Sequence, residues 1–378
     1  MKFKCSQQIL AKSLGTVSKA VAMRTTMPVL KGVLIEVKKD YIKLTATDLN
    51  IQIEKKLTAD IESEGSVIVQ FKLFDEIVRK IPSGDIEIEY IPNENNTEEA
   101  ESSGHISISQ GKLKFNIIGL SPGEFPTIRD GDEEKEKIIL PRRNFKEMIR
   151  KTAFSASLDE SKGIIVGILI EIEKEKLNMI AIDGFRMAIL REALKNEKEK
   201  KIVIGAKILI EIAKIFSEDD VDDDIEMLVS DKIAVISMED TKITLRLLAG
   251  EFIKYKSILP QESRTTVILR RDDLLDCMER AALLAKEGKN NLIVLKISDD
   301  VLEVTSKCDE GDLREEIIAE KKGDSLEIGF NSKYIIDVLK VIEEEEVKLE
   351  LNTNITPCMI KPVEGESFEY LILPVRMN

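Results

Sequence analysis

Apolar residues recur with two different periods along this chain, and segments with one period alternate with segments with the other. A short alternating stretch runs into a segment with apolar residues every three or four positions, which predicts a strand followed by an amphipathic helix. Such units start at Lys2, Ile138 and Val267, and a second set starts at Val67, Ile202 and Leu326. The helices are predicted at residues 6–20, 71–81, 142–155, 206–216, 271–286 and 332–342.

These units form a long-period internal repeat. Equivalent positions such as Leu10, Phe145 and Leu274 recur at intervals of about 130 residues. A polar turn after an alternating strand recurs likewise, at Asp48, Asp183 and Cys308. The remaining sequence alternates as antiparallel strands do, notably over 32–57, 176–192 and 232–248. Each third therefore predicts an α+β domain of two helices backed by roughly eight antiparallel strands.

Polar segments mark the boundaries between the thirds. Residues 131–137 and 259–265 break the periodicity and are predicted to be linkers. The predicted domains are 1–130, 131–259 and 260–378. The polar run 93–104 is predicted to be an inserted loop tip, with His105 as an exposed loop residue.

Composition narrows the class of protein. Aromatic residues make up only 4% of the 378 residues and Trp is absent, so the cores must be aliphatic. A single histidine excludes multi-histidine metal sites, and four dispersed cysteines favour reduced thiols in a cytoplasmic protein. No apolar run is long enough to span a membrane.

Charge is distributed unevenly. The formal net charge of -14 argues against nucleic-acid binding over the whole surface. The six predicted helices nevertheless sum to +8, which leaves -22 for the rest of the chain. Helices gathered on one surface would attract phosphates, although helix propensity alone also explains Lys and Arg there. The helix at 271–286 sums to -1 and runs against the phosphate interpretation.

Motifs for catalysis and cofactors are missing. The chain has no phosphate-binding glycine loop, no dinucleotide fingerprint, no GxSxG and no HExxH, so we expect no catalytic residues, no cofactor and no metal. The acidic cluster of Asp219, Asp220, Asp222, Asp223 and Asp224 is the one basis for a metal-dependent enzyme. It lacks the glycine and terminal glutamate of an EF-hand, which favours a solvated loop.

The C-terminus is unusually apolar. The ending EYLILPVRMN places an apolar run beside the last residues, where free chain ends usually fray. We therefore expect this tail to pack as a strand and to line a groove.

Several segments, taken in order, resemble the bacterial sliding clamps, the beta subunits of DNA polymerase III. They are MKFKC at the start, RTTMPVL at 24–30, TDL at 47–49, DGFR at 183–186, IGFN at 328–331 and YLILPVR at 370–376. The resemblance implies a DNA clamp fold of three similar domains, with two protomers joined head to tail in a ring. It implies a non-catalytic processivity factor that encircles double-stranded DNA without sequence preference.

The resemblance also implies partners and site residues. The replicative polymerase, a clamp loader and repair proteins would dock short apolar peptide motifs. The groove would be formed by Ile165, Ile182, Gly184, Phe185, Arg186, Met187, Pro260, Tyr334, Pro357, Leu371, Ile372, Leu373, Pro374, Val375, Arg376 and Met377. The dimer interface would pair Phe115 and Ile117 with Leu283 and Leu284. Arg24 would lie near DNA, and the charge pattern adds Lys72, Arg142, Arg143, Lys146 and Arg150.

Two departures from the family pattern bear on the groove. Phe185 stands where the family often has His, and Ile253 stands where Pro is common. Both could shift which peptides bind best. A scaffold that binds peptides but not DNA is the alternative, and it differs from the clamp only in the role of the helix charge.

Overall fold

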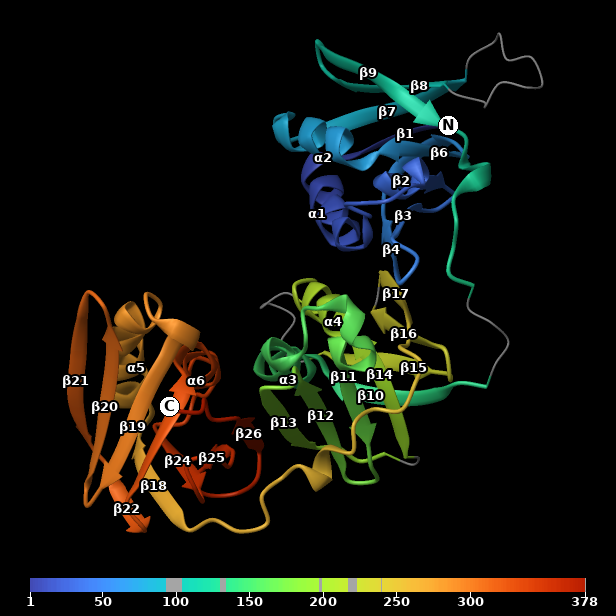
Figure 1. Cartoon of the computed structure of the whole chain (residues 1–378). Helices are drawn as coiled ribbons and strands as arrows, with labels where there is room; N and C mark the ends of the chain where they lie inside the picture. The colour runs from blue at the N-terminus through green and yellow to red at the C-terminus, as the bar shows by residue number, and fades with distance from the viewer. Residues whose placement is uncertain (93–103, 130–133, 197–198, 217–222, 239, 378) are drawn as a thin grey trace. The chain divides into compact units, whose positions relative to one another are not determined.

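A computed structural model describes residues 1–92, 104–129, 134–196, 199–216, 223–238 and 240–377 (Figure 1). The chain divides into two compact units. The first consists of Met1–Pro141 with Asp222–Leu247, and the second of Arg142–Val221 with Leu248–Asn378.

The first unit is built on one antiparallel sheet of 13 strands in the order β10-β15-β16-β17-β4-β3-β2-β6-β9-β8-β7-β1-β5. It joins strands of the first and second thirds of the sequence, because β17 pairs with β4. The strands are β1 (Lys2–Ser6), β2 (Gly32–Val37), β3 (Ile42–Thr47), β4 (Ile51–Leu57), β5 (Asp60–Ser63), β6 (Gly65–Gln70), β7 (Asp85–Pro92), β8 (Gly104–Gln110), β9 (Leu113–Leu120), β10 (Glu136–Pro141), β15 (Asp224–Val229), β16 (Ile233–Met238) and β17 (Thr241–Arg246).

The second unit contains a sheet of nine strands in the order β14-β11-β12-β13-β26-β25-β24-β18-β22, and a sheet of four in the order β21-β20-β19-β23. The pairing of β13 with β26 joins the second and last thirds of the sequence. The strands are β11 (Gly167–Ile172), β12 (Lys176–Ile182), β13 (Arg186–Ala193), β14 (Lys200–Gly205), β18 (Thr265–Arg270), β19 (Leu292–Ser298), β20 (Val301–Cys308), β21 (Gly311–Ile318), β22 (Glu320–Gly323), β23 (Leu326–Asn331), β24 (Glu346–Leu351), β25 (Cys358–Pro362) and β26 (Phe368–Ile372).

The helices pack in sequential pairs, α1 with α2, α3 with α4 and α5 with α6 (Figure 1). In α2, Phe74, Ile77 and Val78 are buried at the spacing of one helix face. Asn331 caps α6 by accepting a hydrogen bond from the backbone N–H of Lys333 at 3.0 Å. The helices are α1 (Gln7–Val17), α2 (Phe71–Lys80), α3 (Arg142–Thr152), α4 (Ala206–Ala213), α5 (Arg271–Ala285) and α6 (Ser332–Leu339).

These elements confirm the repeat predicted from the sequence. Each predicted helix lies where expected, although α4 and α6 end earlier because their last predicted residues form turns. The three repeated turns join β3 to β4, β12 to β13 and β20 to β21. The prediction for His105 is wrong in one respect, since it is exposed but lies in β8, paired with Ile91 and Ile118. Residues 93–103 of the predicted loop lie outside the described residues.

The core is aliphatic, as the composition requires. The largest fully buried side chains include Phe74, Phe145, Phe330 and Tyr370, but most of the buried hydrophobic residues are Leu, Ile and Val. The predicted apolar tail also packs, because β26 is a central strand between β13 and β25.

Gly323 provides a test of this packing. Its φ is +104°, and a Cβ there would lie 1.9 Å from the backbone oxygen of Arg264, opposite β22. Gly365 also has a positive φ, +80°, but a Cβ there meets nothing within 4 Å. Gly365→Ala should cost about 1–2 kcal/mol from backbone strain alone, and Gly323→Ala clearly more. Hydrogen exchange of the β18 amides measures the difference, and equal protection in the two variants would contradict it.

Candidate functional site

The turn between β12 and β13 presents Phe185 to solvent. The Asp183 carboxylate accepts hydrogen bonds from the backbone N–H groups of Phe185 at 2.8 Å and Arg186 at 3.0 Å. Gly184 supplies the positive φ, +97°, that the turn needs. Phe185, at the tip of this turn, is 53% exposed. The equivalent Asp48 holds the first-third turn in the same way, at Asn50 and Ile51.

Strand alternation divides the predicted groove residues between two faces of the nine-stranded sheet. Ile182, Met187 and Leu371 share one face, and we call this the outer face. They are almost fully buried in a cluster with Tyr255 and Met359. Ile372 is fully buried on the opposite face, where it packs with Leu274 and Phe330 in the interior. The prediction that Ile372 lines the groove is wrong, because neighbouring residues of a strand point to opposite faces.

The C-terminal tail forms the rim of this region. The backbone N–H of Leu373 donates to the Phe185 oxygen at 2.8 Å, and that of Val375 donates to the Gly329 oxygen at 2.8 Å. Leu373 remains 37% exposed. Of the other predicted groove residues, Ile165, Pro260, Tyr334, Pro357, Pro374 and Met377 are half-buried and Arg376 is exposed.

An aromatic pair forms one wall. The rings of Phe185 and Tyr334 stack with centroids 6.1 Å apart and an interplanar angle of 22°. The Lys162 amine lies 5.8 Å from the Phe185 centroid. The predicted groove would therefore combine an apolar floor from β12, β13 and β26 with an aromatic wall from α6 and the Asp183 turn.

The basic residues predicted to approach DNA fall into two groups. Arg24, Lys72 and Arg143 are exposed. Arg142 is only 8% exposed, and the Lys146 amine donates to the Phe216 backbone oxygen at 3.1 Å. Arg150 is exposed but pairs with Glu147 at 2.6 Å and Glu343 at 2.5 Å. Arg142 is buried, and Lys146 and Arg150 already bind protein partners, so these features compete with binding to a phosphate.

The residues predicted to form a dimer interface lie next to open sheet edges. Phe115 on β9 is 37% exposed and Leu283 on α5 is 67% exposed. Ile117 is only 9% exposed and Leu284 is half-buried. The sequence reasoning did not single out Ile118 on β9 and Ile318 on β21, which lie on the strand of Phe115 and on a strand packed against α5, and are 65% and 88% exposed. The signal available in the sequence was an isoleucine on the otherwise polar side of each strand.

Three family models match successive parts of the chain. They describe the N-terminal, central and C-terminal domains of the DNA polymerase III beta subunit, and match residues 1–129, 139–254 and 256–376. This chain belongs to the DNA polymerase III beta subunit family.

Relatives match over their whole length. The chain is 32% identical to the beta sliding clamp of Bacillus subtilis and 30% identical to that of Synechocystis, with all of each chain covered. The solved structure of the Bacillus subtilis DNA polymerase sliding clamp is 31% identical with a TM-score of 0.92, again over both complete chains. A solved structure from Eubacterium rectale is 38% identical with a TM-score of 0.92 over both chains.

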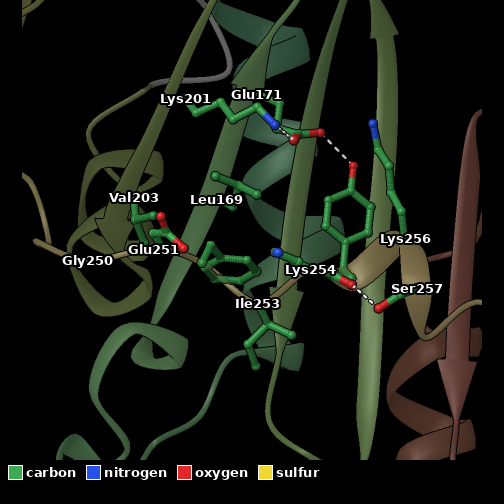
Figure 2. Close-up of a pocket in the computed structure, with 12 residues that line it drawn as sticks. Leu169, Glu171, Lys201, Val203, Gly250, Glu251, Ile253, Lys254, Lys256 and Ser257 are labelled. Atoms are coloured by element: carbon green, nitrogen blue, oxygen red, sulfur yellow. Dashed lines mark hydrogen bonds and ion pairs between the residues drawn. The ribbon is translucent and has the colours of Figure 1, made fainter.

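A pocket of about 640 Å³ in this beta-subunit chain is lined by β11, β14 and the segment 250–257 (Figure 2). Its Leu169, Val203 and Tyr255 belong to the same apolar cluster as Met187 and Leu371. Leu169 and Val203 form its apolar side. The buried Glu171 carboxylate accepts hydrogen bonds from the Tyr255 hydroxyl at 2.5 Å and the Lys201 amine at 2.7 Å. Sequence reasoning missed this cluster, because its three members come from distant segments.

This cluster fastens the segment 250–257 to the sheet. Burial alone would raise the pKa of Glu171, but the Lys201 amine and the Tyr255 hydroxyl hold that pKa below its ordinary value. Burial and the Glu171 carboxylate raise the pKa of Tyr255 in turn. The anionic carboxylate is therefore the form that stabilises the contact.

No helix of the described residues is long and apolar enough to cross a membrane. Within the same residues, no group of three or more His, Cys, Asp or Glu could hold a metal ion. Asp219, Asp220 and Asp222 of the acidic cluster lie outside the part of the chain that the structure describes.

The Glu171 contact predicts a pH dependence. Because the pKa is lowered in the folded protein, its stabilisation is complete above the ordinary value of about 4.3 and is lost as the pH falls through the folded value. Protection factors of the 250–257 amides should therefore fall in acid in the wild type. Glu171→Gln should remove that acid-side dependence, while Glu251→Gln on the pocket rim should keep it. Hydrogen exchange followed by mass spectrometry measures both, and identical pH profiles for all three proteins would refute the prediction.

Proposed function

We propose that this sliding clamp works as a closed ring of two copies that encircles duplex DNA in the cytoplasm and tethers the replicative polymerase. The observation that carries the proposal is the full-length match of all three domains to the beta sliding clamps. The clamp is a non-catalytic subunit, so processivity comes from topology, which makes the enzyme's return to DNA effectively intramolecular.

Two open sheet edges support the ring. β9 pairs with β6 only at Gly119 and Leu120, so residues 113–118 have no strand on that side in the described structure. β21 is the last strand of its sheet. Exposed apolar edges of this kind favour pairing with another chain. Pairing β9 of one copy with β21 of the other makes a head-to-tail interface, which two copies can close.

Charge and apolar surface on these edges are complementary. The exposed residues of β9 and its preceding turn include Lys112 and Lys114. β21 exposes Asp312, Arg314 and Glu316, of which Arg314 pairs with Glu316 at 3.2 Å, so its exposed face keeps an excess of negative charge. Ile118 and Ile318 add apolar area to the same two strands, and Phe115 and Leu283 add area beside them. Opposite charges favour the pairing of β9 with β21 over that of either strand with itself.

Helix starts support the DNA-binding role. The second residue of α2, α3, α4 and α6 is a cation, namely Lys72, Arg143, Lys207 and Lys333, and all four are exposed. A cation in the first turn opposes the helix dipole and costs about 0.3–1 kcal/mol. Lys207 pairs with Glu160, but within the described residues Lys72, Arg143 and Lys333 have no ion-pair partner. Contact with phosphates explains why unfavourable charge recurs there, and Arg24 joins this set.

The acidity of α5 has a structural explanation that leaves this proposal intact. Asp272 and Asp273 occupy its first turn, where negative charge stabilises the helix. Glu279 pairs with Lys340 at 2.8 Å, which places one acid of α5 against a cation after α6. The third domain would approach DNA through α6 more than through α5.

Partner docking belongs to the same proposal. The polymerase, the clamp loader and repair proteins would each place a short apolar peptide on the outer face around Ile182, Met187 and Leu371, between Leu373 and Phe185. An apolar floor gives affinity, and a partly polar rim gives orientation.

The ring predicts a dimer of twice the 42.6-kDa chain mass. Ile118→Asp or Leu283→Asp should shift the mass toward the monomer, because each places an unpaired charge in the interface. Size exclusion with light scattering measures the mass. Leu158→Asp is the matched control, since Leu158 is 81% exposed and outside both edges. A wild-type chain that stays monomeric at high concentration would contradict the ring.

The DNA role predicts opposite effects on stability and on retention. A triple variant with Lys72, Arg143 and Lys333 changed to Gln should unfold no more easily than the wild type, since it loses three unfavourable helix charges. Its half-life on nicked circular DNA should fall, and the dependence on log salt should weaken by roughly 0.9 per lost phosphate contact.

In the assay, the clamp loader of a family member places the clamp on the nicked circle. Cutting the circle into linear DNA then allows the clamp to slide off. Lys39→Gln, exposed in the turn between β2 and β3, is the control and should match the wild type. Retention of the triple variant equal to that of the control would overturn the assignment of these three residues. Wild-type clamp that stays on linear DNA would overturn encirclement itself.

A further inference from the structure

We infer that Arg186 is a positioning residue, which holds the aromatic wall of the partner groove in place without contacting the partner. The inference rests on the proposed function, because it assigns a role within the proposed groove. It revises the expectation from family resemblance that Arg186 lines that groove.

Arg186 faces away from the groove. Met187 lies on the outer face of β13, so its neighbour Arg186 points to the opposite face, toward the helices. Arg186 is only 8% exposed. The resemblance placed both residues on the groove, but alternation along the strand allows only Met187 there.

All three guanidinium nitrogens already donate within the protein. Nε donates to the Asp183 carboxylate at 3.0 Å, Nη1 donates to the Asp337 carboxylate at 2.7 Å, and Nη2 donates to the Phe154 backbone oxygen at 2.6 Å. These partners belong to the turn after β12, to α6 and to the short helix Ala153–Ser155 that follows α3. One side chain thus joins three segments that carry or support the groove walls.

The same guanidinium lies between two aromatic rings. Its carbon is 4.7 Å from the Tyr334 centroid and 5.2 Å from the Phe154 centroid. Phe154 in turn contacts Tyr370 at 5.9 Å, and Tyr334 stacks on Phe185 at 6.1 Å. The stack runs from Tyr370, which is 1% exposed, to Phe185, which is 53% exposed. The exposed ring therefore takes its orientation from a buried anchor through Arg186.

Lysine cannot replace this side chain. An ammonium group is a compact charge, whereas the planar guanidinium can fork between two carboxylates and lie flat between two rings. Arg186→Lys keeps the charge between Asp183 and Asp337 but loses the stack. A partner that only needed positive charge at this position would still bind the Lys variant.

The first test is peptide affinity. The probe is a fluorescein-labelled apolar hexapeptide, selected by display on the wild-type protein, whose binding is lost in Leu373→Asp. Arg186→Lys should weaken its binding roughly tenfold. Asp337→Asn should weaken it in the same direction, and the double variant should show less than the sum of the two effects. Arg191→Lys is the matched control, since Arg191 lies on the same strand and pairs with Glu369 at 2.7 Å. It should bind like the wild type.

The second test measures the order of the aromatic wall in the absence of a peptide. The chain has no Trp, so Phe185→Trp gives a single fluorescent reporter at the exposed end of the stack. Adding Arg186→Lys should lower the Trp anisotropy in the free protein, and adding Arg191→Lys should not. A residue that acts only by touching the peptide would leave the free protein unchanged.

The outcomes separate the inference from the proposed function. Unchanged peptide affinity in Arg186→Lys, or weakened affinity with unchanged anisotropy, overturns the positioning role. If selection on the wild type yields no peptide sensitive to Leu373→Asp, the proposed groove fails, and anisotropy still decides the role of Arg186. If Arg186→Lys does not fold, Asp337→Asn in the Phe185→Trp background takes its place, and unchanged anisotropy there overturns the inference.

Discussion

Backbone pairing between strands of different repeats is the constraint on which this protein depends. The pairing of β4 with β17 joins the first and second thirds of the sequence, and that of β13 with β26 joins the second and last thirds. Each pairing satisfies two edges that a single repeat would expose. The edges at β9 and β21 lack a partner strand within the described residues. The strand pairing that joins repeats within one chain can therefore also join two chains.

The proposed groove depends on the second pairing. Because Met187 lies opposite Leu371, and Ile182 opposite Met187, three apolar side chains meet on one face across β12, β13 and β26. The opposite face of the same strands carries Arg186 and Tyr370, which hold the helices and the aromatic wall. One pair of strands therefore supplies both the proposed binding surface and its support.

Two further groups of charged residues occupy positions that are unfavourable unless a partner compensates their charge. Lys72, Arg143 and Lys333 occupy first turns where negative charge would be more favourable, while Asp272 and Asp273 follow the usual preference in α5. Glu171 is buried on β11, and Lys201 and Tyr255 stabilise its charge. The proposed contact with phosphates would compensate the helix charges, and the Glu171 cluster fastens a crossing segment to the sheet.

The sequence by itself determined the repeat, the helices and the antiparallel strands, because periods of 3.6 and 2 are local properties of the chain. It also indicated that the C-terminal tail packs, and the resemblance covered the whole chain. Tertiary structure alone decided which face each groove residue occupies, and so moved Ile372 into the interior and Arg186 toward the helices. It also brought Glu171, Lys201 and Tyr255 together and left Ile118 and Ile318 exposed. These outcomes depend on register and on contacts between distant segments, which no local period encodes.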